Sequence, residues 1–186
     1  MVSNSLAKRF TLQIGRSTRS LIATLVVSAS ALVGIAGYES YRGTAYLDSG
    51  GIPTLGYGTT EGVKLGDKTT PERALLGLLK DANGAGAGLK RCITAPLYQH
   101  EFEAYVSLAY NVGIHAVCRS SIPRKLSAGD YPEACATILE FDGMRDCSKP
   151  KVWNEKTRRW ECPIVKLPGL TKRRHAEWLT CTGASE

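Results

Sequence analysis

Apolar residues recur at helical spacing along much of this chain. The clearest run, from Phe102 to Val112, predicts a core helix, and Gly113 is expected to end it. Another helix is expected to begin where a Thr cap stands next to Pro71 and Glu72. The same reasoning predicts helices over residues 122–128, 132–141 and 171–180.

Three stretches break this helical pattern. Residues 44–60 are rich in Gly, Thr and Tyr, with turn signals at 48–51 and 56–58, and predict short strands. Gly-rich residues 83–88 form helices poorly and favour a loop, and polar residues 143–165 favour an exposed loop. The predicted fold class is therefore α+β, mostly helical, with one small antiparallel sheet near the start of the body.

Residues 21–38 form an apolar segment of eighteen residues without a charged side chain. As a helix they would reach about 27 Å, slightly less than a hydrocarbon core of about 30 Å. Half of the segment is Ala, Gly, Ser or Thr, so its membrane insertion should be weak. The basic residues before it would stay in the cytoplasm and place the rest outside: Lys8, Arg9, Arg16 and Arg19.

Three interpretations of this segment remain open. It can be a signal-anchor that later leaves the membrane, a cleaved signal peptide with Ala29-Ser-Ala31 as processing site, or a buried core helix. The first two export the same body. We divide the chain into residues 1–38, a basic N-terminus with the apolar helical segment, and residues 39–186, the catalytic domain.

Charge and cysteines agree with export. The net charge of +7 suits an anionic polymer or a membrane surface. Without zinc-finger spacing or a P-loop, no nucleic acid is expected as a partner. Six cysteines without CxxC pairing favour disulfides in an oxidising compartment over buried cytosolic thiols. Six cysteines can be paired in fifteen ways, and the sequence does not choose among them. The one pair predicted here is Cys147–Cys162, which would close the polar segment between these two residues. Widely spaced histidines give no metal signature, so no metal or cofactor is expected.

Two carboxyl groups near the start of the body are candidates for catalysis. Glu39 directly follows the apolar segment, where partial desolvation would help it keep the proton that a general acid donates. Asp48 lies in a Ser-Gly-Gly turn that can keep it ionised, and the Thr54 hydroxyl could hold a water against it. Two carboxyls in different environments are the groups that glycoside hydrolysis requires.

Four motifs in this order resemble phage-type lysozymes, glycoside hydrolase family 24, over about residues 36–181. Residues 37–58 resemble the active-site motif of that family, with Glu, Asp and Thr at its spacing. Residues 97–113 resemble its long core helix. Residues 124–131 match a third motif, and Leu167-Pro-Gly-Leu170 followed by Arg173, Arg174 and Glu177 matches a fourth.

The resemblance implies a lysozyme-like fold and hydrolysis of the β-1,4 bond between N-acetylmuramic acid and N-acetylglucosamine in peptidoglycan, causing host lysis. It implies an inverting mechanism with Glu39 as general acid and with Asp48 and Thr54 handling the water. Asn111 is a candidate substrate-binding residue, against a structural role at the helix end. The N-terminal segment resembles the signal-arrest-release endolysins. Expected partners are glycan strands and, through residues 21–38, the inner membrane; the protein would act as a monomer, first on the periplasmic side of the membrane and then in the periplasm.

The chain also departs from that family. Thr59 stands where many relatives have His, and no cysteine precedes Cys92, so a thiol-exchange switch in the apolar segment is excluded. Two alternative functions remain: a lytic transglycosylase, which needs a single acid, and a non-catalytic, membrane-anchored protein that binds the cell wall.

Overall fold

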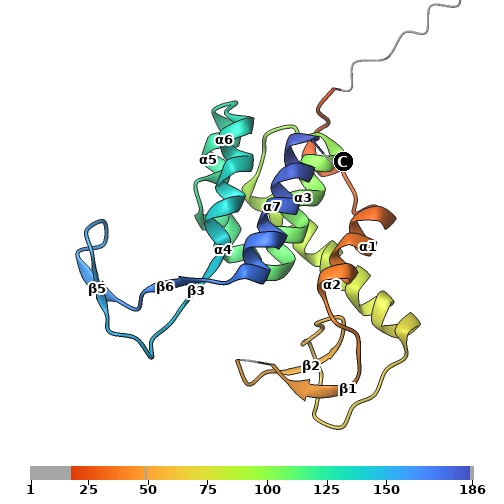
Figure 1. Ribbon diagram of the computed structural model, residues 1–186. Coiled ribbons are helices and arrows are strands. Elements are labelled where there is room, and N and C mark those ends of the chain that lie inside the picture. Colours follow the sequence, from red (N-terminus) through yellow and green to blue (C-terminus); the bar gives the residue numbers. More distant parts are fainter. Residues whose placement is uncertain (1–17, 49, 185–186) are drawn as a thin grey trace, which may run out of the picture.

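The computed structural model describes residues 18–48 and 50–184. In it, helices surround a central helix, α3, and a small β-hairpin lies below them, while a second hairpin projects to one side (Figure 1). The helical elements are η1 (Ile22–Thr24), α1 (Ala29–Tyr38), α2 (Pro71–Cys92), α3 (Gln99–Val112), α4 (Ile114–Arg119), α5 (Ile122–Ser127), α6 (Tyr131–Ala136), η2 (Thr137–Phe141) and α7 (Pro168–Thr182).

The strands form three antiparallel pairs. In the described residues, each pair is a separate two-stranded sheet. The pairs are β1 (Arg42–Leu47) with β2 (Pro53–Gly56), β3 (Gly143–Arg145) with β6 (Ile164–Lys166), and β4 (Val152–Asn154) with β5 (Arg159–Glu161).

The hydrophobic core is built around α3. Eight of its residues are buried, including Phe102, Tyr105 and Leu108, and it packs against α2 and α7. Fully burying a large apolar side chain contributes about 1.5–3 kcal/mol, so α3 supplies much of the packing energy. The expected helix boundaries are confirmed here: Gly113 caps the end of α3 with φ of 85°, and Thr70 caps the start of α2.

The apolar segment is not one continuous helix in this structure. It forms the η1 turn, an extended stretch and then α1, because the Ser28 side chain accepts the Ala31 N–H and caps a new helix. Ile22, Leu25 and Ile35 from this segment join the core. No helix within residues 18–48 and 50–184 combines the length and apolar character needed to cross a bilayer. Lys8, Arg9 and Arg16 lie outside the described residues.

The loop predicted at residues 83–88 is wrong, because α2 continues through it to Cys92. A Cβ built on Gly88 would lie 2.5 Å from Ile114 Cγ1, and one on Gly86 would lie 3.1 Å from Phe102 Cζ. The glycines therefore allow α2 to approach α3 and α4 closely. This close packing outweighs the low helix propensity of glycine.

Two further expectations need correction. Residues 143–165 are not a simple exposed loop, because β3 to β5 and most of β6 lie there, so the described part of the chain has three small sheets and not one. Short strands of three residues leave little periodic signal in a sequence. The cysteine prediction is confirmed: all six form disulfides, Cys147–Cys162 among them, with Cys92–Cys118 and Cys135–Cys181.

Candidate active site

Glu39 is positioned by the end of α1. It is the C-cap residue, and its backbone N–H donates to the Ala36 carbonyl. Its side chain is 24% exposed, so it lies at a surface that remains in contact with solvent.

Asp48 and Thr54 are positioned by the β1–β2 hairpin. Asp48 Oδ1 accepts hydrogen bonds from the N–H groups of Gly50 and Ile52, both at 2.8 Å, which fixes the carboxylate in the turn. Thr54 pairs with Tyr46 across the hairpin and is 4% exposed. Its hydroxyl donates to the Ile52 carbonyl at 2.9 Å, so the lone pairs of Oγ1 remain available to accept a hydrogen bond.

One cleft contains all four sequence-predicted site residues: Glu39, Asp48, Thr54 and Asn111. Its volume is about 600 Å³, and its other walls come from β1, the loop after β2, the end of α3 and the start of β3. This size is within the usual range for small-ligand sites. The hairpin thus forms one wall of the cleft and the helices form the opposite wall.

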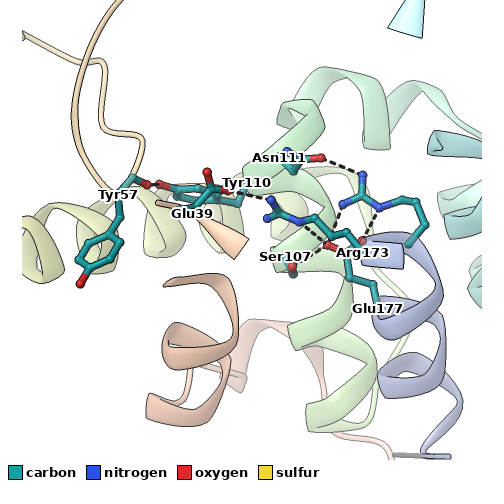
Figure 2. Close-up of polar contacts among 8 residues, drawn as sticks. Glu39, Tyr57, Ser107, Tyr110, Asn111, Arg173 and Glu177 are labelled. Carbon is teal, nitrogen blue, oxygen red and sulfur yellow. Dashed lines mark hydrogen bonds and ion pairs between the residues drawn. The ribbon is translucent and has the colours of Figure 1, made fainter. Parts of the chain in front are cut away.

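An arginine that the sequence analysis left without a role contacts Glu39. Arg173 Nη1 on α7 lies 2.7 Å from Glu39 Oε1, and its Nε lies 3.1 Å from Glu177 Oε1 (Figure 2). Both Arg173 and Glu177 are buried. Arg173 therefore connects the end of α1 to α7 and orients the Glu39 carboxylate.

A buried polar network extends from this arginine. Glu177 Oε1 also accepts the Ser107 hydroxyl at 2.6 Å, and Arg174 Nε lies 2.6 Å from Glu177 Oε2 (Figure 2). Burial lowers the pKa of Arg174, and the Glu177 carboxylate opposes that shift. Arg174 Nη1 donates to Asn111 Oδ1 at 2.9 Å, so Asn111 both lines the cleft and holds the end of α3.

Tyr110 closes the cleft near Glu39. Its hydroxyl donates to the Tyr57 carbonyl at 2.7 Å, which fixes the turn after β2 (Figure 2). Burial raises the pKa of Tyr110, and the negative charge of Glu39 adds to the shift. At Gly58, with φ of 100°, a Cβ would lie 3.3 Å from the Tyr110 hydroxyl and 3.6 Å from Glu39 Oε2. Glycine therefore lets this turn pass close to the carboxyl group.

Thr59 makes a structural contact and is not one of the residues that line the cleft. Its hydroxyl donates to Asp81 Oδ2 on α2 at 2.7 Å, which holds the hairpin against that helix. Within residues 18–48 and 50–184, no group of three or more His, Cys, Asp or Glu side chains has a metal-binding arrangement.

This chain is similar to known proteins over most of its length. The phage lysozyme family model matches residues 36–177. The chain is 38% identical to the endolysin of Acyrthosiphon pisum secondary endosymbiont phage 1, over 81% of this chain and 94% of that one. It is 34% identical to the SAR-endolysin of Pseudomonas phage phiKMV, over 82% and 86%.

A solved structure supports the same relationship. The endolysin from Escherichia coli O157:H7 phage FAHEc1 superposes with a TM-score of 0.72 and 30% identity, over 87% of this chain and 96% of that one. The chain therefore belongs to the phage lysozyme family, and it is a glycoside hydrolase of the muramidase type, which acts on peptidoglycan.

Proposed function

We propose that this enzyme hydrolyses the β-1,4 bond between N-acetylmuramic acid and N-acetylglucosamine and so lyses the host cell. The observation that carries the proposal is that Glu39, Asp48 and Thr54, from two separate elements, line one cleft. Glu39 donates the proton to the leaving oxygen, and Asp48 and Thr54 handle the attacking water.

The two oxygens of Glu39 have different tasks in this proposal. Arg173 donates to Oε1 and holds the carboxyl group in one orientation. Oε2 accepts no hydrogen bond within the described part of the chain and lies beside Gly58, at the cleft. Oε2 therefore carries the proton to the glycosidic oxygen.

The water is held from the hairpin side. Asp48 Oδ1 is occupied by two backbone N–H groups, so Oδ2 is the atom that takes the proton from the water. Thr54 already donates its hydroxyl hydrogen to Ile52, so Oγ1 accepts the second hydrogen of the water. A water between the acid and the base gives attack on the opposite face of the sugar and inversion at the anomeric carbon.

Asn111 is proposed as a substrate-binding residue. Arg174 donates to Oδ1, which assigns the orientation of the amide group. Nδ2 is then the donor available to a sugar oxygen in the cleft.

Purified sacculi incubated with the full chain test the reaction. Glu39→Gln and Asp48→Ala should each lose activity by a factor of about 10²–10⁴, with new reducing ends as the product of the parent. Glu140→Gln, at an exposed glutamate outside the cleft, is the matched control. Products with 1,6-anhydromuramic ends, together with full activity of Asp48→Ala, would show a transglycosylase instead.

We also propose the signal-arrest-release subtype. Residues 21–38 first anchor the chain in the inner membrane with the body, residues 39–186, on the periplasmic side, and later release it into the periplasm. Support comes from the uncharged but weakly apolar segment and from the relative described as a SAR-endolysin. Glu39 follows the segment directly, so membrane anchoring keeps the acid away from Asp48 until release.

Two glycines of α1 provide the test. A Cβ at Gly34 or Gly37 meets no atom within 4 Å, so the folded body tolerates side chains at both positions. Gly34→Leu with Gly37→Leu should keep the protein in the membrane fraction and delay lysis, while Gly34→Ser with Gly37→Ser should not. Normal lysis timing with the leucine pair would refute release.

A further inference from the structure

The segment between η2 and α7 forms a projecting arm, residues 143–166, which contains β3 to β6. In Figure 1 it extends away from the helices. At its base, Lys166 Nζ lies 2.8 Å from Asp142 Oδ2, and β3 pairs with β6. None of the residues of the arm belongs to the buried core of the body. Packing of the body core therefore does not account for this arm.

The arm has a defined internal structure. The Cys147–Cys162 disulfide joins its two sides. Next to this disulfide, the Glu161 carboxylate accepts three hydrogen bonds: from Arg145 Nη1 at 3.0 Å, Asn154 Nδ2 at 3.0 Å and Thr157 Oγ1 at 2.6 Å. A surface fixed in this way loses little conformational entropy when it binds a ligand.

The end of the arm exposes two tryptophans. Trp153 and Trp160 are cross-strand partners with ring centroids 5.8 Å apart, and they are 45% and 64% exposed. Trp153 also lines a groove of about 490 Å³ together with Asn154, Lys156 and Glu161. Indole faces beside amide, ammonium and carboxylate groups are suited to a ligand with apolar faces and polar edges, such as a pyranose ring.

The arm is strongly basic. It carries seven basic and three acidic side chains, a net charge of +4, which is more than half of the net charge of the whole chain. Such a surface attracts an anionic polymer. Peptidoglycan presents sugar rings and, on its stem peptides, free carboxylates.

The arm is continuous with the cleft. Gly143 and Met144, the first residues of β3, form part of the cleft wall opposite Asp48 and Thr54. A glycan strand that leaves the cleft over Met144 therefore reaches the arm. An anionic lipid surface would satisfy the charge and the tryptophans but not this continuity.

We propose that the arm is an accessory peptidoglycan-binding surface, in which Trp153 and Trp160 contact sugar faces beyond the cleft and the basic side chains contact stem-peptide carboxylates. This inference rests on the proposed function. The arm would then favour cleavage of long glycan strands over short ones and would help the enzyme to stay bound to the cell wall.

Binding of full-length protein to purified sacculi, measured by sedimentation in a Glu39→Gln background, tests the proposal. Trp153→Ala with Trp160→Ala should weaken binding about tenfold, and Trp153→Tyr with Trp160→Tyr should restore most of it. Leu65→Ala with Leu76→Ala, two exposed apolar residues outside the cleft and the arm, is the control. In the active protein, the ratio of cleavage of long strands to cleavage of short glycan fragments should fall by a similar factor.

A second set of variants does not disturb the tryptophan pair. Lys151→Gln, Lys156→Gln and Arg159→Gln together should weaken sacculus binding several-fold and flatten its dependence on salt. Unchanged binding in both sets overturns the proposal. The proposal is also overturned if these variants lose binding to vesicles of phosphatidylethanolamine and phosphatidylglycerol but keep their binding to sacculi. That result would assign the arm to lipid. Persistent cleavage by Glu39→Gln would instead contradict the proposed function.

Discussion

Arg173 holds its positive charge against the Glu39 carboxylate from a buried position. Its side chain is 6% exposed, and it contacts Glu39 from α7 across a sequence separation of 134 residues. Removing one partner of a buried ion pair typically costs about 3–5 kcal/mol, because the other charge is left uncompensated. The orientation of Glu39 is therefore tied to the folding of the C-terminal helix.

Thr54 is expected to act through its hydroxyl acceptor and not through its packing. Thr54→Val keeps the shape of this buried side chain but removes Oγ1, so kcat on sacculi should fall about 10²-fold because the water is misplaced. Thr54→Ser keeps the oxygen and should retain most activity. An active Thr54→Val together with an impaired Thr54→Ser, at matched melting temperatures, would show that the methyl group and not the hydroxyl matters.

Tyr110 should make stability depend on pH in the alkaline range. Its pKa in the folded protein is raised above the ordinary value of about 10, chiefly by burial. The native state then binds more protons than the unfolded chain, so the free energy of unfolding falls as pH rises above about 10. Urea unfolding at a series of pH values should show a shallower fall in Tyr110→Phe. An unchanged slope would contradict the assignment.

For single residues, the sequence indicated which side chains line the cleft but not all the residues that contact them. Glu39, Asp48 and Thr54 lie within sixteen residues, so one local motif contains all three. Arg173 and Arg174 were visible as a basic pair in the fourth motif. Their contacts with Glu39 and Asn111 depend on how α7 packs against α3, which no local pattern contains.

Among the elements, α2 shows most clearly how packing and propensity compete. Glycines at 84, 86 and 88 lie in one helix but have different surroundings: open space at Gly84, Phe102 at Gly86 and Ile114 at Gly88. Helix propensity alone would favour replacing all three by alanine. The structure predicts opposite effects at the two ends of this series.

Gly88→Ala should destabilise the protein by about 1–3 kcal/mol, because the added Cβ would overlap Ile114 on α4. Gly84→Ala should stabilise it by about 0.5–1 kcal/mol, since the exposed position has room and alanine forms helices better. Chemical denaturation of both variants measures the difference. A stabilised Gly88→Ala would mean that α2 and α4 are further apart than described.

Periodicity was sufficient for the long helices and insufficient for the short strands. The run from Phe102 to Val112 covers three turns and locates α3, whereas β3 to β6 have three residues each. The pairing of those strands depends on the Cys147–Cys162 disulfide and on the Glu161 contacts. The sequence predicted the disulfide but not the hairpins that it holds.

In the whole molecule, covalent links are unevenly distributed. Cys92–Cys118 joins α2 to α4, Cys135–Cys181 joins α6 to α7, and the third disulfide lies inside the arm. The β1–β2 hairpin and α1 contain no cysteine. Only non-covalent contacts therefore hold the hairpin wall of the cleft and the Glu39 end of α1.

The disulfides should contribute to stability according to their place. Cys135→Ala with Cys181→Ala opens a link of separation 46 in the core and should cost about 4 kcal/mol of global stability. Cys147→Ser with Cys162→Ser should leave the melting temperature of the body nearly unchanged but speed tryptic cleavage in the arm, where basic residues are exposed. Equal shifts in melting temperature for both pairs would contradict this division.

The attachment of Glu39 to the last residue of α1 has a kinetic consequence. Within α1, Ile35 alone is fully buried, so the helix is held to the body by few contacts. Once α1 is detached from the body in most molecules, each further loss of about 1.4 kcal/mol from those contacts lowers the fraction of molecules with α1 in place about tenfold. If detached molecules bind the glycan as well as assembled ones do, such a variant would show a lower apparent turnover with an unchanged Michaelis constant, although every correctly assembled molecule would work at full speed.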